Sequence, residues 1–416
     1  MAGRVQEGFC YQIVVQVPAY SVSVTAMTGA DKSAAPLPGA DKGRRDKSAP
    51  TGFRADVYEP PFTTLRKRWG MAIHKVRFQP VGIEIEVNED ETVLNAAFRQ
   101  GVSLTHGCRE GQCSACKSFL IDGDLEMEKY STFALPEYES EEGYVLLCRS
   151  HAYSDLEVEL INYDEDILRL GIPIVTLQTI VEEIEPLTHD IKRLVLKFTE
   201  PGQRMLFTAG QYADIRIPGS DEHRAYSMAN TPSTNDRLEF IIKVFPGGRF
   251  SSLLEGDISV GQELVVKGPY GVFMLREKSN SDIICIGGGS GMAPLWSLLN
   301  SMAERGIERK ATYYYGARTR KDLFYLDRLK QLEERLPGFR FVPALSMATE
   351  EDEWDGETGL ITEVLNRNLE AGQTRMQAYL CGPPPMIDAA IPVLVGKGIS
   401  EDRIFFDKFT PTGKVE

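Results

Sequence analysis

The spacing of hydrophobic and polar residues divides the chain into segments with different secondary structure. From Ile73 onwards, apolar and polar side chains alternate as they do in a half-buried β-strand. Two such strands, a helix at 93–100, a cysteine-rich loop and short strands that end at 156–160 predict a compact α+β domain over residues 71–165. The acidic, polar residues 162–171 predict a linker after it.

Residues 172–278 contain strand signals throughout. Short apolar runs at 174–177, 191–198, 212–217, 238–244 and 263–267 are separated by turns rich in Pro and Gly. Regular short strands with such turns are typical of an antiparallel β-barrel.

From residue 281 to residue 416, predicted strands alternate with predicted helices. The strands lie at 282–286, 312–315, 339–344 and 378–380, and the helices at 293–305, 322–336, 360–369 and 386–396. This alternation predicts a parallel sheet with a nucleotide at its carboxyl edge.

Residues 1–70 differ from the rest in composition. Residues 28–50 are rich in Ala, Gly, Pro, Ser and Lys, which bury little apolar surface, so the extension is predicted to be disordered. Two interpretations stay open: a flexible tail, or an upstream start that precedes a native start at Met71. The intact mass of protein from its native host distinguishes them.

Composition and charge limit the classes of function. The 416 residues are 42% hydrophobic and 25% charged, as in a globular protein of two to four domains. No apolar run reaches the roughly 18 residues of a membrane span, and the apolar segment 12–18 is too short for a signal peptide, so the cytoplasm is the expected location. Residues 71–170 carry 20 acidic and 8 basic side chains. This acidity argues against nucleic-acid binding and fits either a basic protein partner or a solvated surface.

Four cysteines carry the most specific chemistry in the chain. Cys108, Cys113 and Cys116 form a C-x₄-C-x₂-C run, and Cys148 follows after 31 further residues. Plant-type [2Fe–2S] clusters, in which four thiolates hold two irons, have this spacing. A zinc site is the alternative, although zinc sites prefer two short cysteine pairs and this chain has one. A disulfide framework is disfavoured in a chain of seven cysteines that lacks a secretory signal.

Two motifs in the predicted barrel have the chemistry to hold a nucleotide with a flat ring. In the R-x-Y-S motif, Arg224 could hold a diphosphate, Tyr226 could cover an aromatic ring, and Ser227 offers a hydroxyl. The P-G-G-x-x-S-S run at 246–252 is a loop-then-helix candidate for a phosphate. Taken alone, the arginine and tyrosine equally fit ordinary cross-strand partners.

Two further motifs lie at predicted strand ends. The glycines at 287–291 come between a strand and a helix, where phosphate can approach the backbone, but Met292 replaces the last glycine of G-x-G-x-x-G, so a tight turn is the alternative. The C-G-P-P-P-M run at 381–386 forms a rigid turn after a strand. Cys381 by itself equally fits a small buried residue.

The order of these motifs resembles that of the ferredoxin–NADP⁺ reductase superfamily with an N-terminal ferredoxin domain. More narrowly, it resembles the NADH-dependent FAD/[2Fe–2S] reductase components of bacterial soluble di-iron monooxygenases of the propane, methane and phenol hydroxylase kind. The runs 106–116 and 404–409 add to the likeness, which covers residues 71–416. It implies a β-grasp ferredoxin domain, an antiparallel β-barrel for FAD and a Rossmann-like parallel sheet for NAD.

The resemblance also implies which residues form the sites. The four cysteines would hold the cluster, while Ser227, Cys381 and Phe409 would lie at the reacting rings, with Phe409 covering the flavin. The residues implied to bind FAD are Arg224, Tyr226, Ser227, Gly248, Arg249, Phe250, Ser251, Ser252 and Phe409. Those implied to bind NAD are Gly288, Gly289, Gly291, Cys381, Gly382 and Pro383.

The implied function is electron transfer from NADH, through FAD and the cluster, to a di-iron hydroxylase, by a protein that is a monomer outside that complex. The basic residues in 315–322 could instead meet the 2′-phosphate of NADPH. A reductase of a ring-hydroxylating dioxygenase, or another ferredoxin-type NAD(P)H oxidoreductase, is the alternative. A module that binds nucleotide without turnover is the alternative from a different class, and its visible spectrum would not bleach with NADH.

Overall fold

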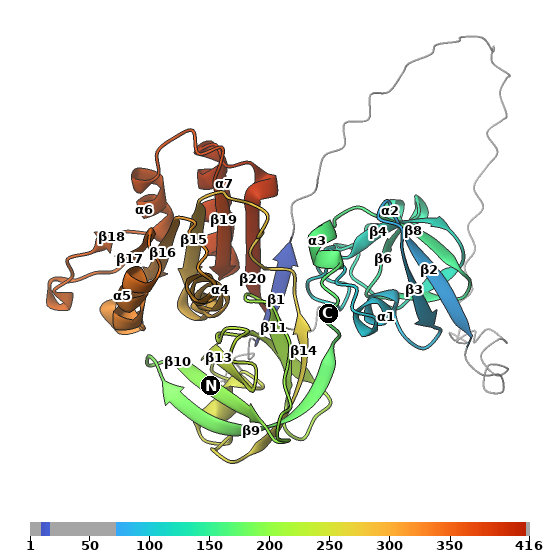
Figure 1. The fold of residues 1–416 in the computed structure, drawn as a ribbon, viewed down its shortest axis with the longest axis horizontal. Coiled ribbons are helices and arrows are strands. Elements are labelled where there is room, and N and C mark those ends of the chain that lie inside the picture. The colour runs from blue at the N-terminus through green and yellow to red at the C-terminus, as the bar shows by residue number, and fades with distance from the viewer. Residues whose placement is uncertain (1–9, 17–71, 413–416) are drawn as a thin grey trace, which may run out of the picture. The chain divides into compact units, whose positions relative to one another are not determined.

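The computed structural model describes residues 10–16 and 72–412 of the chain (Figure 1). Their strands form sheets of seven, six and five strands and one two-stranded ribbon. None of the helices in these ranges has the length and hydropathy that a bilayer crossing requires.

The first domain is a five-stranded mixed sheet packed against one main helix. Helix α1 (Val93–Arg99) begins after Thr92, whose side chain accepts a hydrogen bond from the Asn95 N–H at 3.3 Å. The sheet order is β3-β2-β8-β4-β6, in which β2 and β8 are parallel. These elements are β2 (Ile73–Gln79), β3 (Ile83–Asn88), β4 (Lys117–Asp122), β6 (Tyr144–Leu146) and β8 (Leu156–Leu160), with β5 (Leu125–Met127), β7 (Ser150–Ala152) and α2 (Glu137–Glu141) beside them. The predicted α+β domain is confirmed.

The segment predicted to be a linker contains a short helix, α3 (Glu165–Leu168). Ile167 and Leu168 are buried in the hydrophobic core despite the acidic residues around them. The Leu168 carbonyl also accepts a hydrogen bond from the Ser103 N–H at 3.4 Å. The predicted linker thus contains one helical turn that the sequence pattern did not predict, because two apolar side chains are enough to anchor it.

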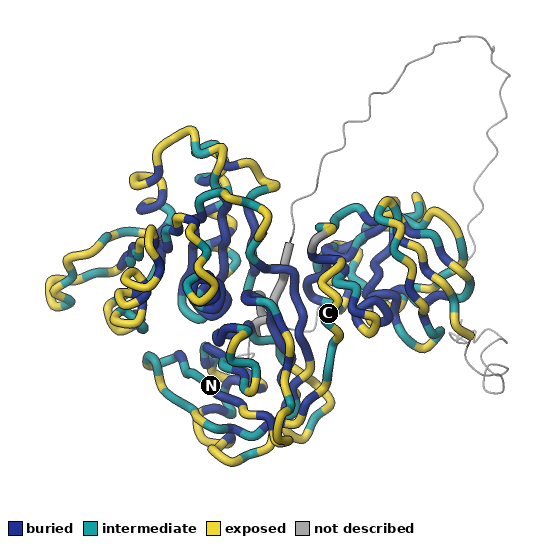
Figure 2. The backbone as a smooth tube through the Cα atoms, viewed as in Figure 1, coloured by how far each residue is buried: buried dark blue, intermediate teal, exposed yellow. Residues whose placement is uncertain are grey.

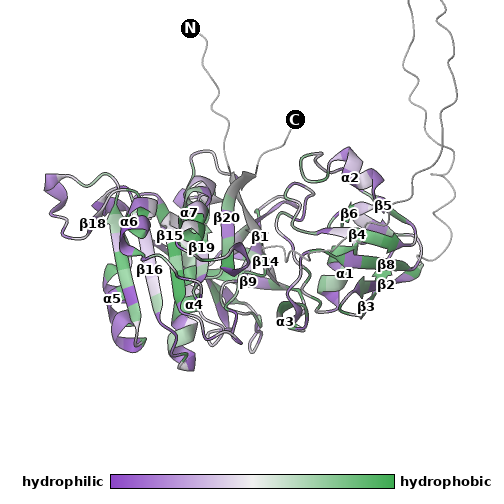
Figure 3. Ribbon diagram, turned by 90° about the horizontal axis from the view of Figure 1, so that it is seen from above, coloured by the Kyte–Doolittle hydropathy of each residue, from purple (hydrophilic) through white to green (hydrophobic). Residues whose placement is uncertain are grey.

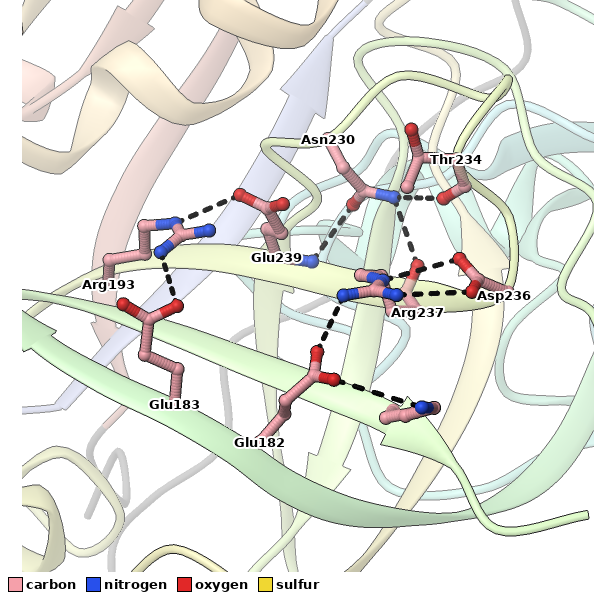
Figure 4. Close-up of polar contacts among 9 residues, drawn as sticks. Glu182, Glu183, Arg193, Asn230, Thr234, Asp236, Arg237 and Glu239 are labelled. Carbon is pink, nitrogen blue, oxygen red and sulfur yellow. Dashed lines mark hydrogen bonds and ion pairs between the residues drawn. The ribbon is translucent and has the colours of Figure 1, made fainter.

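The second domain is a six-stranded antiparallel sheet, of order β12-β11-β14-β9-β10-β13. An isolated bridge between Met228 and Phe240 joins the two ends of that order, so the sheet curls into a nearly closed barrel. Charged side chains lie outside its core, where Arg193 pairs with Glu183 and Glu239 (Figure 4). The elements are β9 (Val175–Pro186), β10 (Ile191–Phe198), β11 (Tyr212–Arg216), β12 (His223–Ser227), β13 (Arg237–Lys243), the 3₁₀ helix η2 (Ser251–Glu255) and β14 (Glu263–Tyr270).

The C-terminal domain is a parallel sheet of order β20-β19-β15-β16-β17-β18, with helices on both faces. Helices α4 and α5 share one hydrophobic core with the sheet, and α6 and α7 share another. Every residue of β15 and β19 is buried, as their dark blue trace in Figure 2 shows. The strands are β15 (Ile283–Gly288), β16 (Ala311–Ala317), β17 (Phe339–Leu345), β18 (Glu357–Thr358), β19 (Gln377–Gly382) and β20 (Ile404–Thr412); the helices are α4 (Met292–Arg305), α5 (Leu326–Arg335), α6 (Ile361–Asn368) and α7 (Pro384–Gly396).

Two elements of the C-terminal domain differ from their prediction. Helix α5 begins at Leu326 rather than near residue 322, because a 3₁₀ helix (η4, Arg320–Asp322) and a left-handed Tyr325 (φ 59°) precede it. Strand β20, which the sequence pattern did not predict, extends the sheet beside β19.

The structure describes one strand of the N-terminal extension, β1 (Cys10–Gln16), which pairs antiparallel with β20. This segment therefore differs from the prediction that the extension is disordered. Residues 28–50, whose composition suggested that prediction, lie outside the described residues, as does Met71.

Candidate functional site

The four predicted cluster cysteines lie as two pairs. The Cys108 N–H points to the Cys113 sulfur at 3.2 Å, and the side chains of Cys116 and Cys148 are hydrogen-bonded to each other. The loop that carries the first three holds Arg109 and Ser114 in the left-handed region, with φ of 59° and 58°. Such backbone conformations are costly outside glycine and concentrate where function requires them.

The environment of Cys108 favours the thiolate, which is the form that binds metals. A hydrogen bond with Cys113, together with the N–H groups of Glu110 and Gln112, lowers the pKa of Cys108 to about 6. Those two N–H groups lie 3.4 and 3.1 Å from its sulfur. Backbone donors of this kind also stabilise the negative charge of a bound cluster.

The separation of the two cysteine pairs distinguishes a two-iron cluster from a single zinc ion. Four sulfurs around one zinc at 2.3 Å would lie within roughly 3.8 Å of one another. Among the described residues, one group has three or more candidate ligand atoms all within 4.8 Å, and it is His189, Asp190 and Asp322. The cysteines are therefore too far apart for one zinc, whereas two pairs of thiolates fit two irons.

A cavity of about 440 Å³ is lined by residues of both the barrel and the C-terminal domain. Its walls include β12 from the barrel and the strand ends of β15 and β16 from the parallel sheet, so it lies at the edge where nucleotides bind in such sheets. The predicted site residues that line it are Tyr226, Ser227, Ser251, Gly288, Gly289, Pro383 and Phe409. The structure thus brings together motifs that lie 183 residues apart in the chain (Tyr226 to Phe409).

The other predicted residues of the barrel motifs lie behind this lining. Phe250 is buried in the barrel core, with its ring centroid 5.4 Å from that of Tyr226, and so supports the tyrosine. The Ser252 hydroxyl donates to the Gly248 carbonyl, which shapes the turn before η2. Arg249 pairs with Glu222 on the exposed side of this turn.

The glycines of the 287–291 loop have different roles. Gly288 and Gly289 line the cavity, where a bare backbone lets a ligand approach closely. Gly291 does not line it; a Cβ there would lie 2.6 Å from the carbonyl carbon of Cys381 and 2.8 Å from the Cα of Gly382. The last glycine therefore lets the loop pack against the end of β19. Cys381 itself is fully buried, and burial raises the pKa of its thiol, so the thiol is neutral.

Several buried polar atoms in or beside the cavity wall have no hydrogen-bond partner among the described residues. They include Arg224 Nε in β12 and Ser227 Oγ, which lines the cavity. Buried polar groups are almost always paired in folded proteins, so these atoms indicate a bound polar ligand. A flavin with its diphosphate would offer a partner to both atoms, and the residues present fit FAD.

Three family models match the chain. The 2Fe-2S iron-sulfur cluster binding domain matches residues 76–153, the oxidoreductase FAD-binding domain matches 178–275, and the oxidoreductase NAD-binding domain matches 285–391. The reductase component of propane 2-monooxygenase from Mycolicibacterium goodii is 52% identical over 340 residues, which cover 81% of this chain and 97% of that protein. The chain belongs to this family of monooxygenase reductase components.

This reductase is also similar to more distant relatives and to solved structures. The reductase component DmpP of phenol 2-monooxygenase from Pseudomonas sp. (strain CF600) is 37% identical, covering 81% of this chain and 94% of that protein. Among solved structures, the cytochrome P450 reductase GcoB of Amycolatopsis superposes with a TM-score of 0.73 at 30% identity, covering 81% and 99%. The predicted fold class and the cofactors [2Fe–2S], FAD and NAD are confirmed, and the chain is an NADH-dependent oxidoreductase of this type.

The sequence reasoning missed Asp407, which is fully buried at 0% exposure in β20 of this reductase. Burial raises its pKa well above the usual value, and the nearby Ser227 hydroxyl opposes that shift only in part. A lone Asp between Phe406 and Lys408 carried no recognisable signal. Its place beside Ser227 depends on the two domains meeting in the fold.

The raised pKa of Asp407 predicts how the stability of this reductase changes with pH. The folded protein holds this proton more tightly than the unfolded chain, so the stability contribution is complete below about pH 4 and is lost as pH rises towards the folded pKa. Each unit of raised pKa corresponds to about 1.4 kcal/mol. Asp407→Asn, which cannot ionise, should therefore lose less stability than the wild type between pH 5 and pH 8.

Urea unfolding of the flavin-free protein at both pH values measures this difference. Asp221→Asn on the exposed surface is the matched control and should behave as the wild type. An equal loss of stability in Asp407→Asn and the wild type would contradict the assignment of a neutral, buried Asp407.

Proposed function

We propose that this reductase takes electrons from NADH and delivers them one at a time to the di-iron hydroxylase of a propane monooxygenase-type system. The observation that carries the proposal is the shared cavity, in which the R-x-Y-S strand and Phe409 face the glycine loop and Pro383. When bound, NADH would supply a hydride to FAD, and the [2Fe–2S] cluster would pass on the resulting electrons singly.

The residues of the chain would act by positioning. We infer that Tyr226 and Phe409 pack against the flavin ring, that the Ser227 hydroxyl lies at its reacting edge, and that the orphaned guanidinium nitrogen of Arg224 bonds the diphosphate. Gly248, Arg249, Phe250, Ser251 and Ser252 would shape the diphosphate loop. Gly288, Gly289 and Gly291 would place the NAD phosphates, with Cys381, Gly382 and Pro383 beside the nicotinamide.

Two carboxylates support the preference for NADH over NADPH. Asp190 and Asp322 both line the cavity, and Asp322 also lies 3.1 Å from the guanidinium of Arg318. Asp190 pairs with Lys243 at 2.8 Å, and Asp322 pairs with Arg318, so each carboxylate offsets the positive charge that a 2′-phosphate would need. This acidic pair was not apparent from the sequence, because Asp190 belongs to the barrel and Asp322 to the C-terminal domain.

The surface next to the cysteine loop supports a protein partner. Phe133 is 91% exposed, and the loop that carries it is tied to the cysteine loop, since the Ser114 hydroxyl donates to the Ala134 carbonyl at 2.7 Å. The acidic helix α2, purple in Figure 3, follows directly. An exposed aromatic side chain with acidic neighbours fits an apolar pocket with a basic rim.

Phe133→Ser should therefore raise the KM for the hydroxylase about 10-fold or more, because an exposed aromatic anchor is lost. The rate at which NADH reduces the reductase itself should not change. Steady-state assays at several hydroxylase concentrations measure this, with Val260→Ser, another exposed apolar residue on the barrel side, as control. An unchanged KM would place the docking surface elsewhere.

Reconstitution tests the proposal as a whole. Visible absorption from flavin and iron–sulfur that bleaches with NADH, together with turnover when a propane-type hydroxylase is added, supports it. Bleaching with turnover only on a ring-hydroxylating dioxygenase would support the alternative partner. A cytoplasmic location and a monomeric state outside the complex stay predictions; cell fractionation and analytical ultracentrifugation test them.

A further inference from the structure

The cysteine loop is attached to the barrel by a buried ion pair. Arg109, which follows the predicted ligand Cys108, places Nη2 at 2.7 Å from both carboxylate oxygens of Asp214. The two side chains are 16% and 3% exposed. The guanidinium also lies over the ring of Tyr270, 3.9 Å from its centroid.

Neighbouring contacts hold the same loop from a second side. His106 Nε2 accepts a hydrogen bond from the Gly271 N–H at 3.1 Å, and the Tyr212 hydroxyl lies 3.5 Å from the Gly107 carbonyl. The backbone before the first cysteine and the side chain after it are thus both bonded to barrel residues. A loop held at two points has one defined position on the barrel.

Strand β11 explains why Asp214 faces the loop. Its alternate residues Ala213 and Ile215 belong to the barrel core, so Tyr212 and Asp214 point outwards. Across to β12, Tyr212 pairs with Ser227 and Asp214 pairs with Ala225. The attachment point of the cysteine loop therefore lies on the strand next to the R-x-Y-S motif.

The burial of this ion pair costs free energy, so its role is better explained by the geometry that it specifies than by added stability. Burying a carboxylate costs free energy that its partner only partly returns, so a buried pair is weak support for stability and better suited to fixing a register. Within the barrel, Asp214 also has His223 Nε2 at 3.4 Å, which is half exposed. Asp214 therefore keeps one polar neighbour within the barrel when Arg109 is replaced, and Arg109 is the partner that joins it to the cysteine loop.

We propose that the Arg109–Asp214 pair is a latch that fixes the cysteine loop against the flavin-binding strands and thereby sets the rate of electron transfer from flavin to cluster. Arg109 and Asp214 are positioning residues, since neither lines the cavity. The cluster would take one electron at a time from the reduced flavin, and over two such transfers the flavin would also release one proton to solvent. The inference rests on the proposed electron path and adds the contact that controls the transfer from flavin to cluster.

Stopped-flow spectroscopy of the holoprotein tests the latch in Asp214→Asn, which keeps the shape of the side chain and removes its charge. Flavin bleaching by NADH should keep its wild-type rate, whereas reduction of the cluster should slow at least 10-fold. The reduction potential of the cluster should not change, because the cysteine ligands are intact. Hydrogen exchange of the amides of residues 106–112 should increase, and this readout does not depend on turnover.

Two further variants and one control separate the latch from a general loss of stability. Arg109→Ala should reproduce the slow cluster reduction, and Arg109→Lys, which keeps the charge, should restore part of the rate. Glu239→Gln breaks a comparable ion pair within the barrel, that of Arg193 in Figure 4, and should change neither rate.

The outcomes of the test differ for the two proposals. Wild-type protein whose cluster is never reduced after NADH is added would overturn the proposed function. A wild type that reduces its cluster, with Asp214→Asn and Arg109→Ala reducing theirs equally fast, would overturn the latch. Slow reduction accompanied by a shifted potential would also overturn it, because the ion pair would then tune the cluster instead of positioning it.

Discussion

Cys148→Ser is expected to abolish electron delivery to an acceptor protein while NADH continues to bleach the flavin. Cys148 is 4% exposed and forms one of the two cysteine pairs with Cys116, so its loss leaves one iron with a single thiolate. The flavin motifs belong to other domains and do not contact it. Reduction of an acceptor protein should fall by at least about 100-fold.

The measurement follows flavin absorbance, iron content and acceptor reduction in the same preparation. Cys285→Ala is the matched control, because this buried thiol in β15 lies outside the quartet and its loss should leave the iron content unchanged. If flavin bleaching also disappeared in folded, FAD-loaded Cys148→Ser, the proposal that NADH reduces the flavin independently of the cluster would be wrong.

Gly291→Ala is expected to impair NADH binding strongly without affecting the FAD content. An added methyl group would overlap the backbone of Cys381 and Gly382, and backbone cannot move aside as a flexible side chain can. Overpacking of this kind costs about 1–3 kcal/mol. Because the glycine loop must shift away from β19, the KM for NADH should rise roughly 10-fold.

Steady-state kinetics with an artificial one-electron acceptor measures this effect, and the ratio of flavin to protein checks the FAD content. Gly396→Ala is the control in the same domain: its Cβ would meet nothing within 4 Å, and it ends helix α7. Alanine there should be neutral or stabilise by up to about 1 kcal/mol. An unchanged KM in Gly291→Ala would mean that the loop need not pack against β19.

The local parts of the site were predictable because their chemistry depends on residues close in sequence. The spacing of the C-x₄-C-x₂-C run predicts a cluster, and glycines between a strand and a helix predict a phosphate loop, from neighbours in sequence alone. Predicted boundaries failed where tertiary contacts decide them. Helix α5 begins later than predicted because Tyr325 adopts a left-handed conformation. The predicted linker contains α3 because Leu168 is buried in the hydrophobic core.

By itself, the sequence determined the three kinds of domain and their order, and it supplied the prediction that four cysteines hold the cluster, since hydrophobic period and short-range spacing are local properties of the chain. Tertiary structure alone decided the contacts between segments far apart in sequence. It placed Asp407 beside Ser227, set Asp190 and Asp322 on one cavity, and brought Arg109 to Asp214 across 105 residues. These pairings depend on which faces of different domains meet, and no periodicity or spacing within one segment encodes that.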